Sequence, residues 1–104
     1  MTLRMVACQP KTLPEEIHME EAIGDVTNFL NGYFQVVAIG EKLLLYALEY
    51  PLSQPFNRMF RGKPMYGNSL ISKLGRVGKR ASLSDQEITS LITELIVPIK
   101  NETN

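Results

Sequence analysis

The sequence contains one cysteine, one histidine and no tryptophan among its 104 residues. A single cysteine excludes a disulfide framework within the chain, and a single histidine excludes a metal site built from several histidines. The apolar stretches are only a few residues long, far below the roughly 18 residues that a membrane-spanning helix needs. Eleven basic residues balance eleven acidic residues, so the chain as a whole lacks the basic excess that is typical of nucleic-acid binders.

The composition is that of a folded, globular chain. Hydrophobic residues make up 44% and charged residues 21%, values that exclude a disordered, collagen-like or coiled-coil protein. We expect a single domain over residues 1–97, followed by a frayed polar tail over residues 98–104. The first ten residues lack the apolar core of a secretory signal, which indicates a cytoplasmic protein with no membrane partner.

The first thirty residues predict two short strands followed by a helix. Residues 3–8 alternate as a strand does, and Pro10 removes the N–H donor that would continue it. Residues 14–19 can return as a short partner strand after a turn. From residue 20 the period changes to that of a helix, whose apolar face is formed by Ala22, Val26, Phe29 and Leu30.

The middle of the chain predicts a hairpin and then a loop. Residues 33–39 are aromatic and β-branched, which is typical of a strand. Gly40-Glu41 can form a two-residue turn, and residues 42–50 are predicted to return antiparallel, although their leucines also suit a helix. Residues 51–64 hold three prolines and one glycine, which indicates irregular structure.

The last third predicts one more strand, over residues 66–74, and a well-marked helix. Ser84-Asp85-Gln86-Glu87 is a capping box, and the apolar stripe behind it consists of Ile88, Leu91, Ile92, Leu95 and Ile96. The order β(β)αββ-loop-βα predicts an α+β fold. We expect a small two-layer sandwich in which both helices pack on one face of an antiparallel or mixed β-sheet.

Between residues 51 and 84 there is no acidic residue, whereas seven of the eleven basic residues lie there. Guanidinium groups bind phosphate through paired hydrogen bonds, aromatic faces stack on bases, and amides can contact base edges. We therefore predict a site for a phosphate-bearing nucleotide ligand, with Asn57, Arg58, Phe60, Arg61, Tyr66 and Asn68 as its binding residues. The alternative is a solvated loop whose charges have no ligand and whose phenylalanines belong to the core.

Five strings occur in this order along the chain: Val6-Ala7-Cys8-Gln9-Pro10, Asn31-Gly32-Tyr33-Phe34-Gln35-Val36-Val37, Pro55-Phe56-Asn57-Arg58, Tyr66-Gly67-Asn68-Ser69-Leu70-Ile71 and Ser82 to Glu87. In these strings the chain resembles a family of small uncharacterised proteins encoded by bacteriophages and plasmids, grouped as a domain of unknown function. Asn31 departs from the family, which has a glycine there. The resemblance implies a phage-type accessory protein in the cytoplasm of a bacterial host, a setting in which small proteins sequester nucleotide-derived immune signals.

Patterns that would indicate catalysis are weak. Gly62-Lys63 is followed by Pro64, and residues 75–79 lack the third glycine of a dinucleotide fingerprint, so neither segment is a phosphate loop. Cys8 is expected to be a structural thiol and His18 a surface side chain. We expect no enzyme, no cofactor and no metal site.

Three classes of function follow from the sequence. The first is stoichiometric sequestration of a nucleotide-derived immune signal without cleavage, in a homo-oligomer, because a chain of 11.7 kDa can hardly enclose such a ligand alone. The second is weak nucleic-acid binding, against which the zero net charge counts. The third is an inhibitor module for a host defence or restriction factor, with the apolar run Leu43-Leu44-Leu45 as a candidate oligomer or partner face.

Overall fold

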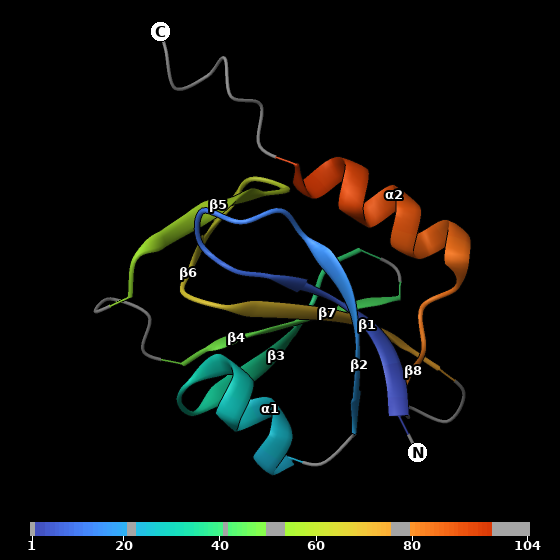
Figure 1. Cartoon of the computed structure of the whole chain (residues 1–104), viewed down its shortest axis with the longest axis horizontal. Coiled ribbons are helices and arrows are strands. Elements are labelled where there is room, and N and C mark those ends of the chain that lie inside the picture. The colour runs from blue at the N-terminus through green and yellow to red at the C-terminus, as the bar shows by residue number, and fades with distance from the viewer. Residues whose placement is uncertain (1, 21–22, 41, 50–53, 76–79, 97–104) are drawn as a thin grey trace, which may run out of the picture.

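An antiparallel β-sheet forms the centre of the molecule (Figure 1). The computed structural model describes residues 2–20, 23–40, 42–49, 54–75 and 80–96. Strands follow one another across the sheet in the order β2-β1-β7-β4-β3, and β8 pairs with β7. Their bounds are Thr2–Cys8 for β1, Glu15–Glu20 for β2, Phe34–Ala38 for β3, Leu43–Leu48 for β4, Ser69–Leu74 for β7 and Arg80–Ala81 for β8.

Two helices and a separate hairpin complete the fold. The helices are α1, Ile23–Leu30, and α2, Asp85–Leu95, and the strands β5, Phe56–Phe60, and β6, Lys63–Tyr66, form a two-stranded sheet of their own. Figure 1 shows α1 on one side of the central sheet, and α2 with the β5–β6 hairpin on the other. The predicted α+β class, with an antiparallel sheet and two helices, is confirmed.

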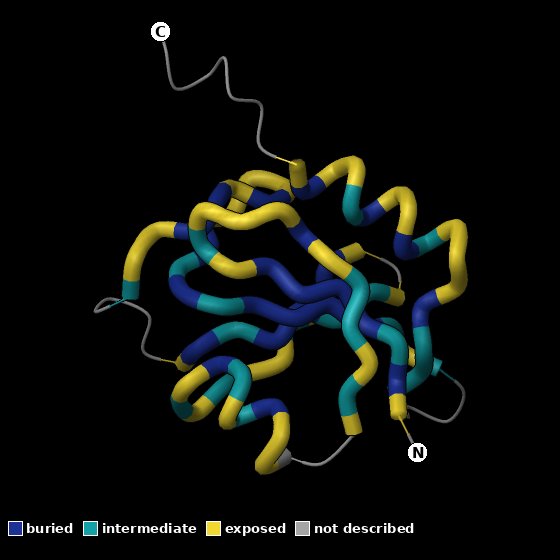
Figure 2. The backbone as a smooth tube through the Cα atoms, in the orientation of Figure 1, coloured by how far each residue is buried: buried dark blue, intermediate teal, exposed yellow. Residues whose placement is uncertain are grey.

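The central sheet is apolar on both faces, because its inner strands carry hydrophobic residues at consecutive positions. In β1, Leu3 and Met5 pack in the cluster that contains α1, whereas Val6 and Cys8 pack in the cluster that contains α2. In Figure 2 the inner strands are coloured mostly as buried residues. The expectation that both helices pack on one face is therefore wrong: a sheet with two apolar faces needs a cover on each.

The leucine run of β4 follows the same alternation. Leu45 is buried in the α2 cluster, with Leu43 packed against it, while Leu44 packs against the α1 cluster. The run therefore lies within the fold and is not the exposed partner face that the sequence analysis considered. Its place in β4 also settles the alternative for residues 42–50 in favour of a strand.

The capping box that begins α2 is confirmed. The Ser84 hydroxyl accepts a hydrogen bond from the N–H of Glu87, whose carboxylate accepts one from the N–H of Ser84, so the capping box is complete. Asn31 follows α1 with a φ of 65°, and Gly40 ends the β3 segment with a φ of 88°. The two-residue turn predicted at Gly40-Glu41 is wrong, because Ile39 lies opposite Leu43 and three residues, 40–42, join β3 to β4. The predicted tail over 98–104 and the turn residue Glu41 lie outside the described residues.

The predicted loop over residues 51–64 is wrong over its second half, which forms β5 and the start of β6. The two strands are joined by Arg61 and Gly62, since Phe60 pairs with Lys63. Both loop residues have positive φ, 51° and 81°, as a two-residue hairpin of the type I′ class requires. The strand was missed because a register shift between Phe56 and Arg58 breaks the alternation.

Candidate functional site

Arg58 is buried and serves the fold. Its guanidinium donates to the carbonyl oxygens of Leu95 at 2.6 Å, Gln9 at 3.0 Å and Thr12 at 2.7 Å, and to Oδ1 of Asn57 at 2.7 Å. The three bonds to carbonyl oxygens join β5 to the C-terminal end of α2 and to the turn between β1 and β2. Only 4% of Arg58 is exposed, so the predicted phosphate contact has no accessible guanidinium face.

Asn57, Phe60 and Asn68 also have structural roles. The Asn57 amide donates to the carbonyl oxygens of Cys8 and Gly67 at 3.2 and 2.8 Å. Phe60 is buried in the α2 cluster. The Asn68 amide donates to the carbonyl oxygen of Phe29 at 2.8 Å, near the end of α1. The six predicted binding residues therefore do not converge on one site.

Tyr66 lies half-buried at the end of β6, where its ring meets that of Phe56 edge to face, with 5.7 Å between ring centroids. Phe56 remains exposed despite this contact. Of the six residues, Arg61 alone lines the pocket described below.

Arg61 stands at the tip of the β5–β6 hairpin and reaches toward α2. Its Nε and Nη2 form a two-point ion pair with Glu94, at 2.7 and 3.0 Å. Its guanidinium carbon lies 5.0 Å from the centroid of the Phe60 ring. Arg61 thus connects the hairpin tip to α2 through this ion pair.

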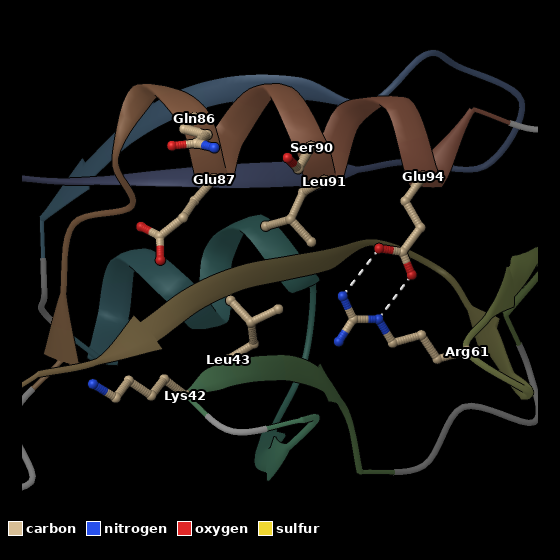
Figure 3. Close-up of a pocket in the computed structure, with 8 residues that line it drawn as sticks. All are labelled: Lys42, Leu43, Arg61, Gln86, Glu87, Ser90, Leu91 and Glu94. Atoms are coloured by element: carbon tan, nitrogen blue, oxygen red, sulfur yellow. Dashed lines mark hydrogen bonds and ion pairs between the residues drawn. The ribbon is translucent and has the colours of Figure 1, made fainter.

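A pocket of about 420 Å³ lies between α2, the beginning of β4 and this hairpin tip (Figure 3). Leu43 and Leu91 face each other across it, the Arg61–Glu94 pair closes one end, and Glu87 and Lys42 lie toward the other. The pocket thus combines an apolar floor with charged groups of both signs. Its lining consists of Lys42, Leu43, Arg61, Gln86, Glu87, Ser90, Leu91 and Glu94.

The two carboxylates of the pocket, Glu87 and Glu94, have different hydrogen-bond partners. The Ser84 N–H and the Lys73 ammonium hold the pKa of the Glu87 carboxyl below its usual value, through hydrogen bonds of 2.8 and 2.9 Å to the same oxygen. Arg61 lowers the pKa of the Glu94 carboxyl. Glu87 is thus tied to the helix cap and to Lys73, whereas Glu94 is tied to the hairpin tip through Arg61.

The basic segment does not form one continuous patch. Arg58 is buried, Arg61 is paired with Glu94, and Lys73 is paired with Glu87. Arg80 lies over the Tyr46 ring, 5.3 Å from its centroid. Arg76 and Lys79, which the sequence analysis counted in the same segment, lie outside the described residues.

The pocket residues on α2 were not predicted to bind anything. Gln86, Ser90 and Glu94 occupy the polar side of an amphipathic helix, which has the same sequence pattern whether it faces water or a ligand. Lys42 carries no motif either. Only the contact between the hairpin tip and α2 marks these side chains as a group.

Cys8 and His18, the two residues of a candidate thiol–imidazole pair, are not brought together. Burial raises the pKa of the Cys8 thiol to about 11, and His18 pairs in register with Arg4 and not with Cys8. No group of three or more metal-ligating side chains occurs in the part of the chain that the structure describes. Within that part, every helix is too short or too polar to cross a membrane.

The chain was compared with protein-family models, with curated proteins and with solved structures. None of the three comparisons finds a match.

Proposed function

We propose that this protein binds a small phosphate-bearing ligand of the nucleotide class in the pocket between α2, β4 and the hairpin tip, and holds it without cleaving it. The single observation that carries the proposal is that Arg61 and Lys42 flank an apolar floor in a pocket of about 420 Å³. Small-molecule sites commonly combine such a volume, about 300–1,000 Å³, with an apolar lining and a few polar groups.

The backbone of Arg61 supports a role for its side chain. A φ of 51° lies in the left-handed region, which glycine, asparagine and aspartate adopt more readily than arginine. The first position of a type I′ loop is usually filled by one of those residues. Arginine is therefore unfavourable for the turn itself, and its value at this position lies in the cation that it places over α2.

The charges of the pocket indicate how an anion would enter. Glu87 and Lys73 neutralise each other, so the carboxylate that competes with an anion for Arg61 is that of Glu94. Lys42 lies toward the other end of the pocket (Figure 3). A phosphate can replace the Glu94 carboxylate on the guanidinium, because both anions accept the same paired hydrogen bonds. The leucine floor then suits the face of a base, and Gln86 and Ser90 provide hydrogen-bonding groups beside it.

The resemblance to phage and plasmid proteins adds a biological role to this proposal. A protein that holds a nucleotide-derived immune signal in this pocket would lower its free concentration in a bacterial host and so counter host defence. The weak nucleic-acid binder finds less support, since Arg58 is buried and Lys73 is paired with Glu87, so the basic segment forms no continuous patch.

Isothermal titration calorimetry tests the proposal with a panel of inorganic phosphate, AMP, cyclic mono- and dinucleotides and ADP-ribose. We expect at least one nucleotide to bind and to be recovered with unchanged mass. Arg61→Asn, which suits the positive φ, should weaken binding about tenfold or more. Glu94→Gln should strengthen binding, because it removes the carboxylate that competes for Arg61.

The matched control is Lys63→Ala, which removes a cation close to Arg61 in sequence from an exposed position outside the pocket. It should leave affinity unchanged. Binding that is indifferent to both Arg61→Asn and Glu94→Gln would place the ligand elsewhere. A panel in which nothing binds, or a recovered ligand that has been cleaved, would overturn the proposal.

A further inference from the structure

The two outer strands of the central sheet differ in charge. On β2, one edge of the sheet, Glu15, Glu16, His18 and Glu20 lie within six residues. On β3, the opposite edge, the sequence Phe34-Gln35-Val36-Val37-Ala38 carries no charge and no proline. Proteins commonly protect edge strands from pairing with charges, proline or bulges. The β2 edge has such protection, and the described β3 strand has none.

The hydrogen bonds of β3 show which backbone groups face outward. The N–H of Ile39 donates to Leu43 at 2.9 Å, and the carbonyl oxygen of Tyr33 accepts from Glu49 at 2.9 Å. In an antiparallel pair these bonds occur at every second residue, so the odd-numbered residues of β3 bond to β4. The N–H and C=O groups of Phe34, Val36 and Ala38 therefore point away from the sheet.

Most residues of this edge are exposed. Tyr33, just before β3, is 80% exposed and Val36 is 37% exposed, and Gln35 and Ala38 are also exposed. An uncharged edge with three residues offering donors and acceptors is suited to accepting another strand.

We propose that β3 pairs antiparallel with β3 of a second copy of this chain, so that the two sheets join across a twofold axis at Val36. In this register Val36 lies opposite Val36, and Phe34 lies opposite Ala38. The pattern is self-complementary, as an isologous contact requires. The inference is independent of the proposed ligand pocket, which lies between α2 and β4.

The side chains of β3 favour this occupant and this orientation. Phe34, Val36 and Ala38 alternate onto one face of the sheet, the face on which Phe34 packs against the α1 cluster. In the antiparallel register the large Phe34 ring lies opposite the small Ala38 of the other copy, and the exposed Val36 lies opposite its own equivalent. A second copy therefore covers exposed apolar side chains with apolar side chains and brings no charge beside them.

Sedimentation equilibrium of the full chain over a range of concentrations tests the proposal. We expect a monomer–dimer equilibrium that ends at twice the chain mass of 11.7 kDa. Val36→Lys sets two like charges directly opposite each other and should weaken the dimer about tenfold or more. Ala38→Lys, also on the exposed edge, is the second variant if Val36→Lys fails to fold by circular dichroism.

The matched control is Glu15→Lys, which adds a lysine to the β2 edge and should leave the dimer intact. A chain that stays monomeric at every concentration overturns the proposal. So does a dimer that Val36→Lys and Ala38→Lys leave unchanged, or a β3 edge that pairs only with a different protein.

Discussion

The guanidinium of Arg58 lies 2.6 Å from the carbonyl oxygen of Leu95, so a buried cation from β5 closes the last turn of α2. The carbonyl groups at the C-terminal end of a helix lack partners within the helix and carry partial negative charge. Arg58 supplies both a donor and a positive charge there. The same side chain supplies donors to Gln9 and Thr12 in the turn between β1 and β2.

Replacing Arg58 should destabilise the fold strongly. Arg58→Ala removes the guanidinium donor from two buried acceptors, the Leu95 carbonyl oxygen and Oδ1 of Asn57, and from the Thr12 carbonyl oxygen. We expect a loss of about 3 kcal/mol or more in the free energy of unfolding. Arg58→Lys keeps the charge but not the planar set of donors, so the loss should be smaller. Urea denaturation measures both. A loss below about 1 kcal/mol for Arg58→Ala would contradict the structural role.

Replacing Arg61 should have little effect on stability. Arg61→Asn loses a partly exposed ion pair with Glu94, worth about 0.2–1 kcal/mol, and gains a residue that accepts the positive φ. The two effects oppose each other, so the net change should stay within about 1 kcal/mol. The same denaturation assay serves, with Arg58→Ala as the contrasting variant. A loss similar to that of Arg58→Ala would mean that Arg61 is needed for the fold.

Stability should fall as the solution becomes acidic. The pKa values of Glu16, Glu87 and Glu94 are all lowered from 4.5 in the folded chain, by Arg4, by Ser84 with Lys73, and by Arg61. At pH values below the pKa of these carboxyls in the unfolded chain, the unfolded chain binds more protons than the folded chain. The stabilisation is therefore complete above that pKa, and it is lost as the pH falls through the lower pKa values of the folded chain. Thermal unfolding from pH 7 down to pH 3 (about the range that these groups titrate in) measures this. In Glu87→Gln the slope should be shallower; an unchanged slope would show that Glu87 does not contribute.

The Cys8 thiol should be inert while the chain is folded. Cys8 is fully buried, and burial raises its pKa to about 11, so almost no thiolate forms at neutral pH. We expect iodoacetamide to leave the native protein unmodified by mass spectrometry and to alkylate it fully in denaturant. Rapid labelling of the native protein at the same rate as the denatured one would contradict the burial of β1.

Local signals in the sequence predicted much of the fold. The capping box depends on Ser84 and Glu87, which are close in sequence, so the pattern contains the interaction. The placement of α1 and α2 on opposite faces depends on which strands become central. Residues such as Leu44 and Leu45 show that both faces are apolar, but only the strand order reveals that each face needs its own helix.

The candidate site was harder to predict than the fold. Arg58 and Arg61 lie three positions apart in a basic segment, and nothing local distinguishes them. The first meets carbonyl groups 37 to 49 residues away in sequence, and the second meets Glu94, 33 residues away. Whether an arginine is structural or available to a ligand is decided by these distant partners, which one sequence does not display.

The buried arginine of β5 also bears on how the molecule opens. The β5–β6 hairpin is not a strand of the central sheet, and a hairpin of this size held only by its own ladder would fray independently. Arg58 and Asn57 instead bond it to the first strand, the turn that follows and the last helix. Backbone amides of the hairpin should therefore exchange with solvent deuterium together with those of β1, so that a small peripheral element belongs to the same cooperative unit as the centre of the sheet.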